Sequence, residues 1–349
     1  MDELFRRGGP HNIRKTGHDQ YTLNISLPAD GEGVIGRECP SEDCSPAYFR
    51  VKLGTGITGE DYDKAFCPYC RTSADPNDFT TKSQVEYGKR IVENEVLDGL
   101  DRMMQKALGM GSSRKKTIGG GMFSMEMSYK PPRKKPVGRP FEEELRRDVR
   151  CPACTLEHSV FGLATWCPDC GADIFPAHLD AELDVVKKML GHVETRREEL
   201  GPRVAARDVE NALEDVVSVF EAVLKQVTRR HLREQGRAPE DVEEVFRKKV
   251  RNTYQSVSRG AVLFEELVGF PLFDGVDARV VEQLEATFEK RHPITHNLGV
   301  LDRKYLDKAR SGELEGREVR VTAREIEEAV DLVSRVVVAA YERAFPPAT

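Results

Sequence analysis

The chain has 349 residues, 39% of them apolar, which is enough for two or three folded, soluble domains that each bury a core. No stretch approaches the roughly 18 consecutive apolar residues of a membrane span, and the first residues lack the apolar core of a signal peptide, so we expect a cytoplasmic protein without membrane contact. The net charge of −6 argues against a wholly basic nucleic-acid binder, although residues 114–150 hold 11 Lys/Arg against 5 Asp/Glu and are therefore +6, leaving −12 for the rest.

Residues 1–80 predict a small β-rich domain. Alternating apolar residues indicate one strand over 21–27 and another over 49–53. The same region contains two cysteine pairs with short spacing, Cys39 with Cys44 and Cys67 with Cys70. A thiolate pair with two to four intervening residues can bind one Zn²⁺ from a tight turn, and a second such pair completes a tetrahedral site. We therefore expect a first zinc ribbon in this domain.

Residues 81–150 predict a helix, a strand and a basic linker. Ser83 and Glu86 have the spacing of a capping box, and an apolar helical stripe follows them. We expect a flexible loop over 109–121 and a strand over 123–129. The proline-rich sequence KPPRKKPVGRP then carries four cations that could bind a phosphate backbone, Arg133, Lys134, Lys135 and Arg139. The alternative is a solvated linker that keeps two domains apart.

Residues 151–177 predict a second zinc ribbon. Its four cysteines are Cys151, Cys154, Cys167 and Cys170, and 12 residues between the two pairs allow a short hairpin. Because every expected ligand in both sites is a cysteine, no coordination position is left for a substrate water, and we expect two structural Zn²⁺ per chain. Disulfides are the alternative, but they fit poorly with a chain that lacks an export signal.

Residues 178–349 predict an α-helical bundle. Apolar residues recur at three- and four-residue steps over 209–227 and over 280–288. A capping box at Thr322 and Glu325 starts a last helix with a further apolar stripe. We expect four or five helices in one bundle. The predicted fold class is therefore α+β, with β-rich zinc-ribbon modules followed by an all-α domain.

The sequence KRHPITHNLG, residues 290–299, places an arginine, two histidines and an asparagine around a proline at the end of a predicted helix. Pro293 cannot donate an N–H, so the helix must break or restart there, and a restart would bring His296 back toward Arg291. Histidine moves protons near neutral pH and arginine stabilises charge on a phosphate, which suits RNA cleavage without metal, with the 2′-hydroxyl as nucleophile. The alternative is an ordinary helix end, where such residues cap the helix or bind a loop.

The helical region with RHPITH resembles the HEPN superfamily, whose nucleases carry an arginine followed, after four to six residues, by a histidine. Four residues separate Arg291 from His296 here, and His292 matches the polar residue that often follows the arginine in that family. The resemblance covers about residues 178–349. It implies a metal-independent endoribonuclease with Arg291 and His296 as catalytic residues, while His292 and Asn297 orient the phosphate or the imidazole.

The resemblance also implies partners and biology. HEPN nucleases form dimers that bring two motifs together across the interface, and they serve in toxin systems, antiviral defence against phage and RNA processing. We therefore expect RNA as substrate, a homodimer, and a protein partner such as an antitoxin. Some members of the family are not catalytic and act as binding or dimerisation modules.

Two functions thus remain open. The first is a ribonuclease whose zinc ribbons recognise RNA, a trigger or a partner, and it is favoured because both motif residues are present. The second is a non-catalytic adaptor or nucleic-acid-binding protein, in which ribbons and bundle both bind partners. It is favoured because the acidic bundle offers RNA little electrostatic attraction. Cleavage of RNA that depends on Arg291 and His296 would separate the two.

Overall fold

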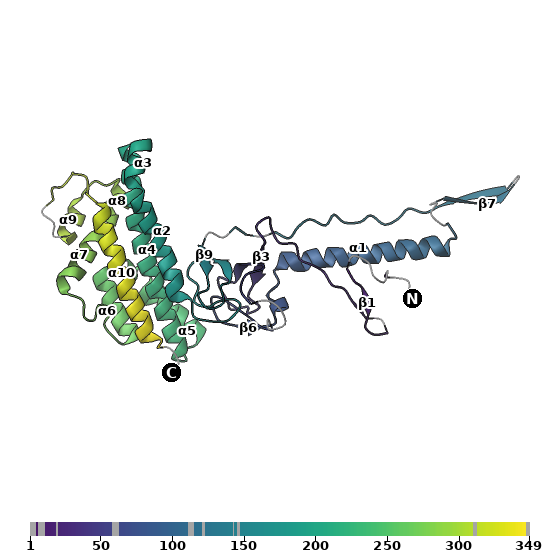
Figure 1. Cartoon of the computed structure of the whole chain (residues 1–349), viewed down its shortest axis with the longest axis horizontal. Coiled ribbons are helices and arrows are strands. Elements are labelled where there is room, and N and C mark those ends of the chain that lie inside the picture. The colour runs from purple at the N-terminus through teal and green to yellow at the C-terminus, as the bar shows by residue number, and fades with distance from the viewer. Residues whose placement is uncertain are drawn as a thin grey trace. The chain divides into compact units, whose positions relative to one another are not determined.

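The computed structural model describes residues 5, 11–18, 20–57, 63–110, 115–120, 123–141, 143–144, 147–309 and 313–346. It confirms the expected α+β class, with small antiparallel sheets in the N-terminal part and helices in the C-terminal part (Figure 1). The chain divides into two compact units. The first comprises residues 1–146, 156–159 and 168–170, and the second comprises 147–155, 160–167 and 171–349.

The first unit contains an antiparallel hairpin of β3 (Val34–Glu38) and β4 (Tyr48–Lys52), with β10 (Glu157–Val160) next to β4. Ile35 pairs with Val51, and both are buried because residues directly opposite each other on paired strands lie on the same face of the sheet. Two shorter pairs join β1 (Arg14–Lys15) to β2 (Tyr21–Thr22) and β5 (Ala65–Phe66) to β6 (Ser73–Ala74).

Two strand predictions for this unit have different outcomes. The strand expected over 49–53 is confirmed as β4, with its start and end one residue earlier. The strand expected over 21–27 is wrong beyond Thr22, because its partner β1 has only 2 residues and offers no further ladder.

The long helix α1 (Lys82–Ala107) follows the short 3₁₀ helix η1 (Pro76–Phe79). It begins at Thr81, whose hydroxyl accepts the Gln84 N–H while the Gln84 side chain accepts the Thr81 N–H. The capping box expected at Ser83 and Glu86 is therefore wrong by two residues. Both pairs have suitable spacing, but the Gln84 amide also donates to the carbonyl of Gly36 in β3, at 2.8 Å, and this tertiary bond selects the start.

A second hairpin corrects one loop prediction. β7 (Lys115–Gly120) pairs antiparallel with β8 (Phe123–Ser128), so the expected strand near 123–129 is confirmed but the expected loop is wrong over Lys115–Gly120. Glycines hide the strand signal of β7, and pairing with β8 supplies its backbone partners. Residues 111–114 and 121, also part of the expected loop, lie outside the described residues.

The second unit contains β9 (Arg147–Arg150) and a set of helices. Among its described residues these are α2 (Phe175–Gly191), α3 (Val193–Leu200), α4 (Pro202–Glu234), α5 (Pro239–Val245), η2 (Phe246–Val250, a π-helix), η3 (Thr253–Gln255, a 3₁₀ helix), α6 (Val257–Val268), α7 (Ala278–Glu289), α8 (Arg291–Asn297), α9 (Arg303–Ala309) and α10 (Ala323–Ala344). The five that have at least 12 residues, α2, α4, α6, α7 and α10, match the expected number of bundle helices.

The core of the second unit is organised around α4, which packs against α2, α3, α6 and α10 (Figure 1). The predicted stripe from Val209 to Val227 is buried along its length, and Phe220 meets Phe288 of α7 edge to face, with ring centroids 5.4 Å apart. The capping box at the start of α10 is confirmed. Within the described part of the chain, each helix is too short or too polar to cross a lipid bilayer.

Candidate metal centres and the arginine-histidine helix

The first cysteine cluster brings together all four cysteines predicted for it, Cys39, Cys44, Cys67 and Cys70. Two pairs of sulfurs, Cys39 with Cys70 and Cys44 with Cys67, lie 3.6 Å apart, and all four lie within 4.8 Å of one another. A tetrahedral zinc with bonds of about 2.3 Å requires sulfurs about 3.8 Å apart. The observed spacing fits such an ion, and it is far from the roughly 2.05 Å of a disulfide.

The second cluster likewise brings together Cys151, Cys154, Cys167 and Cys170, within 4.8 Å of one another. The sulfurs of Cys154 and Cys167 lie 3.4 Å apart. In both clusters the first cysteine of each pair is buried and the second is partly exposed. The chain therefore contains two tetracysteine groups that are able to hold metal ions.

Three of the four cysteine turns share one backbone geometry, which the repeated sequence Cys-Pro-x-Cys explains. The residue after the second cysteine, namely Arg71, Thr155 or Gly171, has a φ between 63° and 66° and donates its N–H to the carbonyl of the first cysteine. This left-handed residue turns the chain so that both sulfurs face one point. The Cys39–Cys44 turn is wider, because four residues rather than two separate its cysteines, and the Cys39 N–H donates to the carbonyl of Ala47.

The cysteine turns shift the pKa values of their thiols in both directions. Burial raises the pKa of Cys151, but hydrogen bonds from the backbone N–H groups of Cys154 and Ala153 outweigh it, and the pKa lies below its ordinary value. In the first cluster, hydrogen bonds from Cys39 and Cys44 lower the pKa of Cys70, whereas hydrogen bonds with Cys39 raise the pKa of Cys44 and of Cys67. Binding of a metal ion therefore has to displace protons from some of these sulfurs.

The arginine-histidine sequence forms its own short helix, α8, directly after α7. The expected restart at Pro293 is confirmed, since the proline lies in the first turn of α8, where no intrahelical N–H bond is needed. The rings of His292 and His296 lie 4.9 Å apart between centroids, and His296 is exposed. Arg291 and His296 both belong to α8, but no hydrogen bond joins their described side chains.

Arg291 is held by a chain of polar residues that sequence reasoning missed. Its guanidinium donates to the Gln255 amide oxygen at 2.8 Å, and the amide nitrogen of Gln255 donates to Glu221 at 2.8 Å. Glu221 in turn pairs with Lys225 at 2.5 Å and is only 14% exposed. Because Glu221 can only accept, it fixes the orientation of the Gln255 amide and so presents its oxygen to Arg291. Gln255 has no sequence signal, since it belongs to the short helix η3.

Two further polar side chains of α8 bind nearby acids. Asn297 donates to Asp302 at 2.8 Å, and the Thr295 hydroxyl donates to Glu214 of α4 at 2.7 Å. The Asn297 amide is thus engaged with the next loop rather than with either histidine. Glu214 and Glu221 place two carboxylates of α4 beside α8.

The basic linker residues lie on the first unit. Lys134 pairs with Asp98 of α1 at 2.7 Å and Lys135 with Glu93 at 2.9 Å, so α1 neutralises part of the predicted cationic stretch. Arg133 and Arg139 are exposed. Whether this segment contacts nucleic acid stays a prediction.

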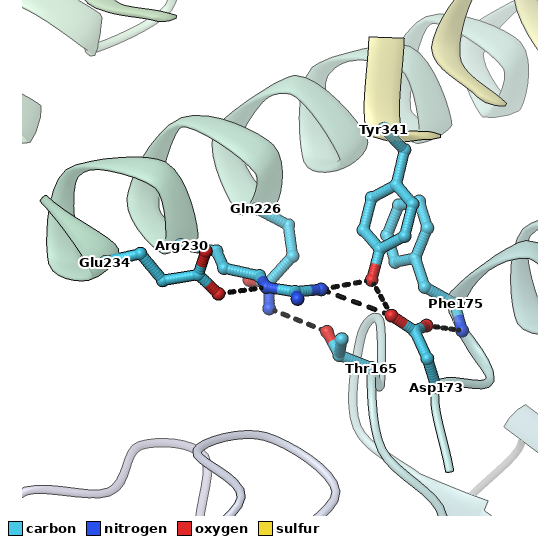
Figure 2. Close-up of polar contacts among 7 residues, drawn as sticks. All are labelled: Thr165, Asp173, Phe175, Gln226, Arg230, Glu234 and Tyr341. Atoms are coloured by element: carbon cyan, nitrogen blue, oxygen red, sulfur yellow. Dashed lines mark hydrogen bonds and ion pairs between the residues drawn. The ribbon is translucent and has the colours of Figure 1, made fainter. Parts of the chain in front are cut away.

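A second polar cluster, unforeseen from the sequence, joins the segment around Cys167 to α4 and α10. Arg230 of α4, Asp173 and Tyr341 of α10 converge in it, with Thr165 and Gln226 beside them (Figure 2). The residues come from distant parts of the chain, with 168 positions between Asp173 and Tyr341, so no local pattern indicates the cluster.

Comparison with known proteins adds no identity. Neither a scan of protein-family models nor searches of curated proteins and of solved structures find a match to this chain.

Proposed function

We propose that the chain is a metal-independent endoribonuclease of the HEPN type, in which α8 carries the catalytic residues and each cysteine cluster holds one structural Zn²⁺. One observation carries the proposal. Arg291 is held from the side by Gln255, while His296, within the same short helix, is exposed. A fixed cation and an accessible imidazole on one element are the groups that phosphate chemistry needs without metal.

The reaction uses the RNA's own nucleophile. His296, acting as general base, takes the proton of the 2′-hydroxyl, and the new O2′–P bond forms as the P–O5′ bond breaks. The leaving O5′ takes up a proton from solvent water and His296 returns its own proton to solvent, so the products are a 2′,3′-cyclic phosphate and a 5′-hydroxyl. Arg291 stabilises the charge that grows on the phosphorane-like transition state. His292, whose ring lies 4.9 Å from that of His296, orients the imidazole.

His296→Ala should lower RNA cleavage by roughly 10²- to 10⁴-fold because it removes the proton carrier. Cleavage of mixed RNA is measured in EDTA, with zinc content checked in parallel. Arg291→Ala should lose activity as well, whereas His192→Ala, which removes an exposed histidine outside α8, serves as the matched control and keeps it. RNA that stays intact with the wild-type chain under every activating condition tried contradicts the proposal.

The assembly follows from the same proposal. A two-fold dimer that places α8 at or beside its interface would double every site and bring two motifs together. We expect a dimer mass by sedimentation at micromolar concentration, and a protein partner such as an antitoxin would act by covering α8. Toxicity of the expressed chain, relieved in an Arg291→Ala/His296→Ala variant, would support a role in toxin or antiviral systems. A strictly monomeric chain would count against the dimer.

The second candidate function is a non-catalytic adaptor. It is favoured by Glu214 and Glu221, two carboxylates beside α8 that repel an RNA backbone. In that case Arg291 serves only as a structural link to Gln255. Arg291→Ala would then lower the melting temperature, and partner binding would persist without any cleavage.

A further inference from the structure

The Cys167–Cys170 turn of the second cysteine cluster is flanked on both sides by residues that pack against the helices of the second unit. Trp166 precedes Cys167 and forms an antiparallel bridge with Asp173, which follows the turn. Backbone bonds from Cys167 to Ala172, at 2.9 Å, and from Ile174 to Thr165, at 2.8 Å, close the same ladder. The chain then enters α2 at Phe175. The residues that flank the cysteines are thus part of the packing of the helices.

Asp173 binds three elements with one carboxylate. One oxygen accepts the N–H of Phe175, at 3.0 Å, and the other accepts the hydroxyl of Tyr341 in α10, at 2.5 Å, and the guanidinium of Arg230 in α4, at 3.3 Å (Figure 2). The ring of Tyr341 also stacks on Phe175, with centroids 4.1 Å apart. A shift of Asp173 would therefore disturb the start of α2, the end of α4 and the end of α10 together.

Arg230 is the centre of the contact. Its guanidinium carbon lies 4.6 Å from the centroid of the Trp166 ring and 3.8 Å from that of Phe345, and its Nε donates to Glu234 at 2.8 Å. The side chain is only 17% exposed. A cation so enclosed depends on its partners, and removal of Asp173 and Trp166 would take away one of its two carboxylates and one of the rings it lies over, and would also remove the carboxylate that binds the Tyr341 hydroxyl.

We propose that the second cysteine cluster is a metal-dependent lock on the helical unit, in which bound metal holds Trp166 and Asp173 against Arg230 and Tyr341. The sulfur spacing and the turn geometry of this cluster fit a metal ion, as described above. A four-cysteine cluster made of two such short turns loses its fold without metal. Loss of metal therefore frees the Trp166–Asp173 bridge and loosens the ends of α4 and α10.

The lock is linked to the site of the proposed function through α4. The same helix that carries Arg230 also carries Glu221 and Glu214, which bind Gln255 and Thr295. The inference itself does not need the nuclease, because it concerns the stability of the unit and the metal affinity of the cluster.

The experiment uses the zinc-loaded full chain and a metal chelator. Trp166 is the single tryptophan of the chain and is 9% exposed, so tryptophan fluorescence reports on the surroundings of this one residue. We expect chelation to shift its emission to the red. Hydrogen exchange by mass spectrometry should show lost protection in peptides around Tyr341 but not in peptides of α7.

Thermodynamic reciprocity gives the sharper test. If metal stabilises the Arg230 contacts, those contacts must stabilise the bound metal. The red shift of Trp166 emission in Arg230→Met should therefore occur at a chelator concentration about 5-fold or more below that of the wild type. Arg343→Met is the matched control. Arg343 belongs to α10, the helix of Tyr341, and like Arg230 it pairs with an acid and lies over an aromatic ring, here Asp274 at 2.8 Å and Phe270, but no contact joins it to the cysteine turn in the described structure. In Arg343→Met the red shift of Trp166 emission should occur at the same chelator concentration as in the wild type.

Two results would overturn the inference. One is release of zinc with unchanged protection around Tyr341 in the wild type. The other is the same chelator midpoint for Arg230→Met as for the wild type. Should Arg230→Met fail to fold, Tyr341→Phe, which removes one hydroxyl, must shift the midpoint in the same direction, and the absence of that shift also overturns the inference.

Discussion

Gln255 lies outside α8 and orients an arginine of that helix, Arg291. Its amide nitrogen is committed to Glu221 and its amide oxygen to Arg291. The guanidinium has five N–H donors, so binding one of them to Gln255 leaves others for a phosphate. Orientation of Arg291 therefore depends on a polar chain that runs back to Lys225 of α4.

Gln255→Leu should lower cleavage by about 10- to 100-fold, since small displacements of a catalytic group have effects of this size. Gln226→Leu is a matched control, because it removes the same amide group from a residue whose side chain binds Thr165, at 3.2 Å, away from α8. Initial rates are compared per amount of folded protein. Equal losses of cleavage rate in the two variants would show that Gln255 has only a structural role.

Residue-scale prediction from sequence succeeded where spacing carries the information. Each cysteine pair is local, and the two pairs of each cluster meet as expected. Gln255 and Arg291 are 36 positions apart and Arg230 and Asp173 are 57 apart, so only the folded bundle brings these partners together.

At the scale of elements, Lys290 joins the end of α7 to the start of α10. Its ammonium donates to the Arg320 carbonyl, at 2.8 Å, and to Glu325, at 2.7 Å. Glu325 also accepts the Thr322 N–H as part of the capping box. Lys290 directly precedes α8, so these bonds also connect the residue before α8 to the start of α10.

The pH dependence of stability should report on Glu325. Burial raises its pKa, but hydrogen bonds from Lys290 and from the Thr322 N–H outweigh this and hold the pKa below its ordinary 4.5. A pKa that is lower in the folded chain means that the carboxylate stabilises the fold above pH 4.5, and that this contribution is lost as the pH falls through the lowered value.

Glu325→Gln should therefore unfold more easily than the wild type near neutral pH, and the difference in unfolding free energy should shrink as the pH falls below 4.5. Urea unfolding at several pH values measures it. Glu328→Gln removes an exposed carboxylate of the same helix, paired with Arg324, and should give a smaller difference. A difference for Glu325→Gln that stays constant with pH would contradict the assignment.

Periodicity found the long helices because their buried faces repeat every three or four residues, as in α4 and α10. It failed for β7, whose last residues are glycines, since a strand paired with a hairpin partner needs no apolar pattern. The start of α1 could not be fixed either, because Thr81 and Ser83 both begin suitable capping sequences and the carbonyl of Gly36 decides between them.

At the scale of the whole molecule, the two cysteine clusters determine how much metal the protein needs. Elemental analysis should give about two zincs per chain, each site contributing a free energy on the order of 10 kcal/mol. Cys39→Ser and Cys151→Ser should each lose about one zinc and keep the other. A freshly purified chain with clearly fewer than about two would show that one cluster binds no metal.

The hydrogen bond between Tyr341 and Asp173 joins residues 168 positions apart, near the two ends of the helical unit. During synthesis, α2 and α4 leave the ribosome before α10, so the apolar faces that α10 covers stay exposed until α10 has been made. A chain released before α10 is complete would expose these faces and aggregate rather than form a smaller working domain. The helical unit therefore completes its core only once α10 has been synthesised.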